Sequence, residues 1–115
     1  LRKDMIYMTV GELAVKYSLS SPSPPDPDRE ITGGYTGDLL SWVMSRAKSG
    51  DAWVTIMSNV NIIAVASLTD ASCVILCDGE KPDKEVVSIA NAKGVNVLVS
   101  DKPAFELISA ISQSI

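Results

Sequence analysis

The segment from residue 28 to residue 38 holds the densest group of side chains in this chain that can take part in chemistry. The residues of this group are Asp28, Arg29, Thr32, Gly33, Gly34, Gly37 and Asp38. Glycines directly ahead of a helix allow backbone amides to approach an anion at the positive end of that helix. Asp38, however, falls in the first helical turn, where a carboxylate complements the helix dipole and repels phosphate.

The known phosphate-binding loops do not fit this segment. No Gly-Lys-Ser or Gly-Lys-Thr follows the glycines, and residues 33–37 lack the spacing of a dinucleotide-binding fingerprint. A simpler interpretation is a tight turn held by hydrogen bonds among Asp28, Arg29 and Thr32. Because a charged residue fixed in a glycine turn generally has a carboxylate partner, we expect Arg29 to pair with Asp28 or Asp38.

Small, mostly polar residues follow each of the three clearest predicted strands. These residues are Ser58 and Asn59, Asp78 and Gly79, and Ser100 and Asp101. Ligands of open α/β sheets bind beyond the carboxyl ends of the strands, although such residues also suit turns and helix caps. We therefore predict a ligand cleft between the turn at residues 32–38 and the strand ends at Asn59 and Asp78. The predicted ligand-binding residues are Asp28, Arg29, Thr32, Gly33, Gly34, Asp38, Asn59 and Asp78.

Residue types that usually carry catalysis or hold metals are scarce. The chain has no histidine, and no serine or cysteine lies beside a recognisable base, so we expect neither enzymatic activity nor a cofactor. Cys73 and Cys77 lie four residues apart in one predicted strand, which is about 13 Å and too far for a disulfide. Without a Cys-x-x-Cys motif, one subunit has too few ligands for zinc or an iron–sulfur cluster, so no metal site is predicted.

Apolar periodicity predicts alternating helices and strands. We expect strands over residues 53–57, 73–77 and 95–99, and helices that begin near residues 9, 39, 60, 83 and 103. Thr9 and Glu12 have the spacing of a capping box, and Gly94 marks the end of the helix that begins near residue 83. This alternation predicts an α/β fold, with a mainly parallel sheet of about four or five strands and helices on both faces. The residues expected on the buried helix faces are Val10, Leu13, Ala14, Tyr17, Leu39, Leu40, Val43, Met44, Ala47, Val60, Ile63, Ala64, Ser67, Leu68, Val86, Ile89, Ala90, Phe105, Ile108, Ile111 and Ile115.

Length and composition fit a single domain over residues 1–115. The chain is 46% hydrophobic and 21% charged, which is typical of a packed globular domain. Residues 18–28 are rich in serine and proline and can form neither a helix nor a central strand, so we predict a loop there.

Charge and hydropathy argue against two classes of partner. Ten Lys and Arg residues stand against fourteen Asp and Glu residues and form no basic stripe, so nucleic-acid binding is not expected. No apolar stretch approaches the roughly 20 residues that span a bilayer, so we expect no membrane partner and a cytoplasmic protein with reduced thiols. The aliphatic content favours self-association, most simply as a twofold homodimer.

The segment Asp28-Arg29-Glu30-Ile31-Thr32-Gly33-Gly34 also resembles the signature of the DRTGG domain family. That signature is Asp-Arg, two variable residues of which the second is aliphatic, and Thr-Gly-Gly. The likeness continues through Tyr35, Asp38 and the residues 50–55 to the strand at residues 73–79, so it extends from about Thr9 to the C-terminus.

The resemblance implies a setting for the domain. Domains of this family accompany paired CBS domains, lie within the longer bacterial form of phosphotransacetylase, and resemble the N-terminal domain of HPr kinase/phosphorylase. Free-standing copies occur near anaerobic redox genes. The implied role is regulatory and non-catalytic, and the family fixes no ligand.

Two hypotheses about function stay open at this point. One is a module that senses a small-molecule effector, such as a nucleotide or an acyl metabolite. The other is an interaction or accessory subunit, a homodimer that docks on a larger metabolic or redox enzyme complex without a small-molecule ligand.

Overall fold

Alternate side chains of the central strands face two different helix layers, which is the basis of the fold. In the computed structural model, which describes residues 7–115, Ala52 and Val54 of β3 (Asp51–Thr55) face one apolar cluster, and Trp53 faces the other. Cys73 and Val74 of β4 (Cys73–Leu76) divide in the same way. Strands buried on both faces explain the nearly continuous apolar runs in the sequence.

The sheet has five strands in the order β1-β5-β4-β3-β2. β2 (Gly33–Thr36), β3, β4 and β5 (Val97–Val99) run parallel, whereas β1 (Ser20–Ser23) is an edge strand that pairs antiparallel to β5. The predicted α/β class and mainly parallel sheet are therefore confirmed. The predicted strand at residues 53–57 begins and ends two residues earlier, because Asp51 already pairs with Gly33.

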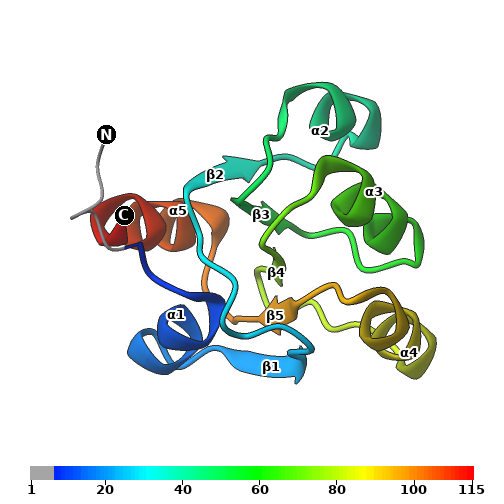
Figure 1. The fold of residues 1–115 in the computed structure, drawn as a ribbon, viewed down its shortest axis with the longest axis horizontal. Coiled ribbons are helices and arrows are strands. Elements are labelled where there is room, and N and C mark those ends of the chain that lie inside the picture. The colour runs from blue at the N-terminus through cyan, green and yellow to red at the C-terminus, as the bar shows by residue number, and fades with distance from the viewer. Residues whose placement is uncertain (1–6) are drawn as a thin grey trace.

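Helices cover both faces of the sheet, as predicted (Figure 1). α2 (Leu40–Arg46), α3 (Asn61–Thr69) and α4 (Lys84–Lys93) connect successive parallel strands and lie together on one face. α1 (Val10–Lys16) and α5 (Ala104–Ser114) pack on the other face. Among residues 7–115, no helix is both long enough and apolar enough to cross a membrane.

Local capping sequences set the ends of two helices. Thr9 and Glu12 form the predicted capping box, in which each side chain accepts a hydrogen bond from the backbone N–H of the other residue, at 3.1 and 2.9 Å. Asp83 caps α4 by accepting from the N–H of Val86, and Gly94 ends that helix in the left-handed region.

The predicted buried faces of three helices are partly wrong. Eight residues that we expected to be buried are exposed: Leu39 and Met44 at α2, Val60, Ala64, Ser67 and Leu68 at α3, and Phe105 and Ile115 at α5. The buried positions include Ile62, Val65 and Ala66 in α3 and Leu107 in α5. α3 is apolar around most of its circumference, so helical periodicity alone does not show which side meets the sheet.

The predicted loop at residues 18–28 contains β1, which corrects that prediction. Pro22 is compatible with this strand because β1 lies at the edge of the sheet and its register against β5 is irregular. The part of the segment that follows β1 is fixed at Asp26 by the buried side chain of Asn96. The Asn96 amide donates to the Asp26 carbonyl at 2.7 Å and accepts from the Asp26 N–H at 2.9 Å.

Candidate functional site

The predicted ligand-binding residues lie at two opposite sides of the sheet, namely where the parallel strands begin (the amino edge) and where they end (the carboxyl edge). Because β2 to β5 are parallel, Asp28, Arg29, Thr32 and Gly33 lie at the amino edge, whereas the residues that follow the strands lie at the carboxyl edge. The carboxyl-edge residues of the predicted set are Asp38, Asn59 and Asp78, and Gly34 lies within β2. The structure therefore does not form the single cleft that we predicted.

Arg29 at the amino edge binds Asp70, not Asp28 or Asp38 as predicted. Its guanidinium donates to the Asp70 carboxylate at 3.1 Å and to the Asp70 backbone carbonyl at 2.9 Å. Asp70 ends α3 in the left-handed region, which turns its carbonyl and side chain towards the segment ahead of β2. Asp38 is excluded as a partner because it lies at the opposite edge. The contact ties α3 to that segment.

The Asp70 carboxyl has a pKa below its ordinary value of 3.8, because the Ser49 hydroxyl and then the Arg29 guanidinium donate hydrogen bonds to the carboxylate. A depressed pKa in the folded protein contributes stability above the ordinary pKa. That contribution is lost as the pH falls through the lowered pKa that Asp70 has in the folded protein.

We expect Arg29→Ala to lower the free energy of unfolding by about 1 kcal/mol at pH 7, since the contact is partly exposed but includes a backbone carbonyl. Urea titrations at pH 7 and at a series of lower pH values measure the effect. The difference between wild type and variant should shrink as the pH is lowered, because protonation of Asp70 in the folded protein removes the ion pair. A difference that is independent of pH would contradict the ion pair.

The predicted glycine turn at residues 33–37 is wrong, because Gly33 and Gly34 are part of the parallel strand β2. Neither glycine has a positive φ angle. A Cβ atom at Gly33 would lie 2.6 Å from a carboxylate oxygen of Asp51, and one at Gly34 would reach the Ile108 and Ile111 side chains of α5 at 3.6 to 3.7 Å. These glycines therefore permit close packing and form no anion-binding turn.

Asp38 and Asn59 at the carboxyl edge serve local structure. One Asp38 carboxylate oxygen accepts from the Thr55 hydroxyl at 2.7 Å and from the N–H of Ile56 at 3.0 Å. Asn59 accepts from the N–H of Asn61 at the start of α3. The alternative interpretation of Asn59 as a turn residue therefore fits the geometry. Asp78 is exposed and lies in the left-handed region at the turn after β4.

The two cysteines are free and buried, and their thiols are protonated at neutral pH. Burial raises the pKa of Cys73 to about 12. Burial, together with a hydrogen bond and charge from Asp78, raises the pKa of Cys77 to about 11. Since the thiolate is the reactive form, neither side chain is suited to act as a nucleophile.

A groove opens at the carboxyl ends of β4 and β5, where the sequence placed Asp78, Gly79, Ser100 and Asp101. Its polar part is a hollow of about 250 Å³. The residues that line it are Tyr17, Ser18, Ser20, Gly79, Glu80, Lys81, Val99, Ser100, Asp101 and Lys102. A second hollow of about 440 Å³ shares Ser20, Lys81 and Val99 with the first and adds Ser21, Pro22 and Pro82.

The lysines of this groove, Lys81 and Lys102, were not predicted from the sequence. Each follows a strand end by only a few residues. Asp78 and Ser100 were identified as candidate site residues from the same kind of position. Single lysines in loops are common, however, and only the strand order brings these two to the same hollow.

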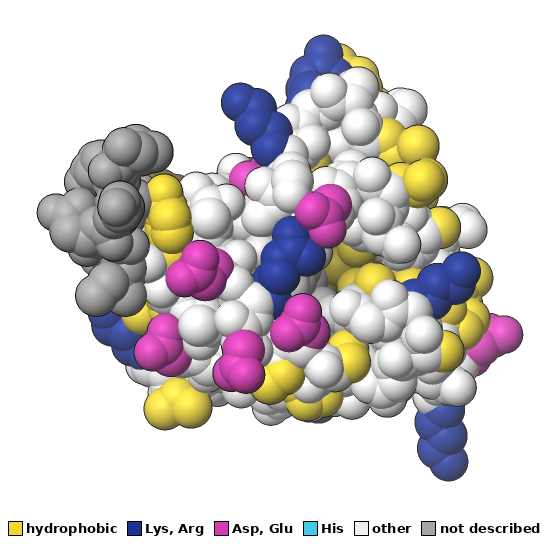
Figure 2. All heavy atoms as spheres, viewed as in Figure 1, with side chains coloured by type: hydrophobic (Ala, Val, Ile, Leu, Met, Phe, Trp, Pro, Cys, Tyr) yellow, Lys and Arg dark blue, Asp and Glu magenta, His cyan; other side chains and the backbone are white. Residues whose placement is uncertain are grey.

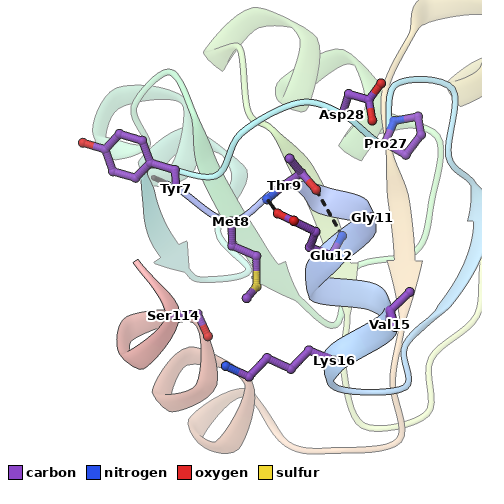
Figure 3. Close-up of a pocket in the computed structure, with 10 residues that line it drawn as sticks. All are labelled: Tyr7, Met8, Thr9, Gly11, Glu12, Val15, Lys16, Pro27, Asp28 and Ser114. Atoms are coloured by element: carbon purple, nitrogen blue, oxygen red, sulfur yellow. Dashed lines mark hydrogen bonds between the residues drawn. The ribbon is translucent and has the colours of Figure 1, made fainter. Parts of the chain in front are cut away.

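A larger hollow, of about 780 Å³, lies elsewhere and is a wide surface depression beside α1 (Figure 3). Asp28 and Pro27 stand on one side of it and Ser114 on the other, while Thr9 and Glu12 hydrogen-bond each other in the capping box. Two of its polar groups are thus already engaged. The carboxyl-edge groove is the better candidate site.

The amino edge is acidic. Acidic side chains lie on the face that carries the segment leading into β2, with a basic side chain among them (Figure 2). Asp26, Asp28, Glu30 and Asp70 belong to this edge, and Arg29 is already paired with Asp70. Within the described part of the chain, no three acidic or cysteine side chains are grouped closely enough to hold a metal ion.

Comparison with known proteins identifies the family. The family model described as the DRTGG domain matches residues 38–114, which is two thirds of the chain. The chain belongs to the DRTGG domain family. The match includes the whole stretch that supplies Gly79 to Lys102 of the groove, but it begins after the Asp28 to Gly34 segment on which the sequence resemblance rested. No curated protein matches the chain.

A solved structure shows the same fold at low sequence identity. It is the crystal structure of the CBS and DRTGG domains of the regulatory region of Clostridium perfringens pyrophosphatase, complexed with its activator, diadenosine tetraphosphate. The TM-score is 0.76 at 15% identity, over 94% of this chain and 47% of that one. This DRTGG chain therefore spans about half the length of the solved chain.

Proposed function

We propose that this DRTGG domain is a non-catalytic regulatory module that senses a small-molecule effector, a nucleotide or an acyl metabolite, in the cytoplasm. The observation that carries the proposal is the polar groove at the carboxyl ends of β4 and β5, because most of its lining lies within the stretch that defines the family. The solved regulatory region with the same fold is complexed with an activator, which supports an effector-responsive role.

The chemistry of the described residues supports a role without catalysis. The chain has no histidine to shuttle protons at neutral pH, and the raised pKa values of Cys73 and Cys77 keep both thiols protonated. Asp38 is engaged by Thr55 and the backbone of Ile56. These groups are suited to structure and recognition.

A thermal-shift screen tests the proposed function. The compounds are diadenosine tetraphosphate, ATP, AMP, acetyl-CoA and acetyl phosphate. An effector present at ten times its Kd stabilises the folded state by about 1.4 kcal/mol, which raises the Tm of a domain of this size by about 5 °C. We expect such a shift with at least one compound. A screen without any shift would contradict effector sensing.

The second candidate is an accessory subunit that docks on a larger metabolic or redox enzyme, as a homodimer and without a ligand. Its support is a set of exposed apolar side chains that includes Leu39, Trp42 and Leu68, of which Trp42 is 54% exposed and stacked against Arg46 at 3.9 Å. Light scattering on the screened samples tests this candidate. A stable dimer together with a silent screen would favour it over effector sensing.

A further inference from the structure

We propose that the groove at the carboxyl ends of β4 and β5 binds a nucleotide, with its phosphate between Lys81 and Lys102 and its base against Pro22 and Pro82 in the adjoining hollow. The inference rests on the proposed function and specifies the class of effector and its place of binding. Four observations support it: the shape of the groove, its rigid floor, its charges and its division into two connected hollows, of which the second is lined by two prolines.

Three segments that are distant in the sequence form the walls of the groove. They are the end of α1 with β1, the turn after β4, and the turn after β5. The two connected hollows, of about 250 and 440 Å³, are of the size that small-molecule sites in proteins usually have. Their position beyond the carboxyl ends of parallel strands is where open α/β sheets bind ligands.

Backbone hydrogen bonds hold the floor of the groove rigid. The N–H of Asp78 donates to the carbonyl of Lys102 at 2.9 Å, and the N–H of Gly79 donates to the carbonyl of Ser100 at 3.0 Å. Gly79 has a φ angle of +79°, and a Cβ atom there would lie 3.4 Å from a carboxylate oxygen of Asp101. The two turns are thus fixed against each other, so little backbone ordering is required when a ligand binds.

The charges of the polar hollow suit a phosphate ester of a sugar. Among residues 7–115, neither Lys81 nor Lys102 takes part in an ion pair, so both ammonium groups are available to an anion. The hydroxyl of Ser100 accepts from the N–H of Lys102 and keeps its own proton to donate. Glu80 and Asp101 also line this hollow, and carboxylates are the usual acceptors for ribose hydroxyl groups.

The adjoining hollow is suited to the base. Pro22, Pro82 and Val99 line it together with Ser20, Ser21 and Lys81, and Val99 lines both hollows. Flat apolar surfaces of this kind can cover the face of a purine or pyrimidine ring. A nucleotide bound across both parts would contact the edge strand β1 and the turn after β4 at once.

Calorimetric titration of the full chain tests the inference, with ATP, AMP, adenosine and acetyl phosphate as probes. We expect ATP to bind at least tenfold more tightly than adenosine, because only ATP can accept charge-assisted hydrogen bonds from the lysines. The variant Lys81→Gln/Lys102→Gln should weaken ATP binding roughly 100-fold, about tenfold for each lysine. Lys93→Gln, in the last turn of α4 at the opposite edge, is the matched control and should bind ATP normally.

Amide chemical shifts locate the site without relying on affinity. Addition of ATP should move the resonances of Gly79, Ser100 and Lys102 and leave those of the Asp28 to Gly34 segment in place. Unchanged ATP affinity of the folded double variant would overturn the inference but not the proposed function. If acetyl phosphate raises the Tm and no nucleotide binds, the nucleotide inference fails alone. If no compound binds at all, both fail.

Discussion

Gly50→Ala should lower the free energy of unfolding by about 3 kcal/mol, which corresponds to a fall in Tm of more than about 10 °C. Gly50 is buried, has a φ angle of +88°, and would place a new Cβ atom on the hydroxyl oxygen of Thr32. The left-handed backbone costs about 1 kcal/mol for a residue with a side chain, and overpacking adds roughly 1 to 3 kcal/mol. Urea unfolding followed by circular dichroism measures the loss.

Gly94→Ala is the matched control for the backbone effect. Gly94 has a φ angle of +72°, but a Cβ atom there meets nothing within 4 Å, so only the backbone cost of about 1 kcal/mol is expected. Combining Thr32→Ala with Gly50→Ala should recover about 1 kcal/mol or more of the loss, because the overlapping hydroxyl is removed. Equal losses for Gly50→Ala and Gly94→Ala would contradict the steric explanation.

Asn96→Ala should lower the free energy of unfolding by about 3 kcal/mol. The buried Asn96 amide donates to the carbonyls of Asp26 and Ser72, at 2.7 and 2.9 Å, and accepts from the N–H of Asp26. Truncation leaves a buried carbonyl without its partner and frees the segment that follows β1, at a cost of about 1 to 3 kcal/mol for each unpaired group. Urea unfolding gives the energy, and limited proteolysis should show faster cleavage within residues 24–28.

Two further variants separate hydrogen bonding from packing at this position. Asn96→Asp preserves side-chain volume but removes both donors, so it should be at least as destabilising as Asn96→Ala. Asn59→Ala removes a single hydrogen bond, from the N–H of Asn61 to an exposed side chain, and should cost about 1 kcal/mol or less. An Asn96→Asp protein of wild-type stability would show that the amide donors are unimportant.

Much of the fold was predictable because it depends on contacts between residues close together in the chain. The Thr9 and Glu12 capping box and the Gly94 end of α4 involve groups three to five residues apart, and both were predicted correctly. The alternation of apolar strands and helices likewise predicted the α/β class. Local hydrogen bonds and hydrophobic periodicity do not require knowledge of the strand order.

The candidate site was predicted only in part, since its geometry depends on the strand order. The polar residues after β4 and β5 were located, because strand ends are recognisable in the sequence. The sequence could not show that Asp28 and Asp38 lie at opposite edges. That separation follows from β2 being a strand that pairs with β3 through Gly33 and Gly34, two residues that on local grounds favour a turn.

Residue types and their spacing were enough to predict the fold class, the Thr9 and Glu12 capping box and the family resemblance of this chain. The strand order, by contrast, fixes the partner of Arg29, which lies 41 residues away, the role of Asn96, whose partner Asp26 is 70 residues away, and the meeting of Lys81 with Lys102 in one groove. The range of the interactions explains this division. Caps and periodicity are set within a few residues, whereas these contacts exist only after the strands have paired in one particular order.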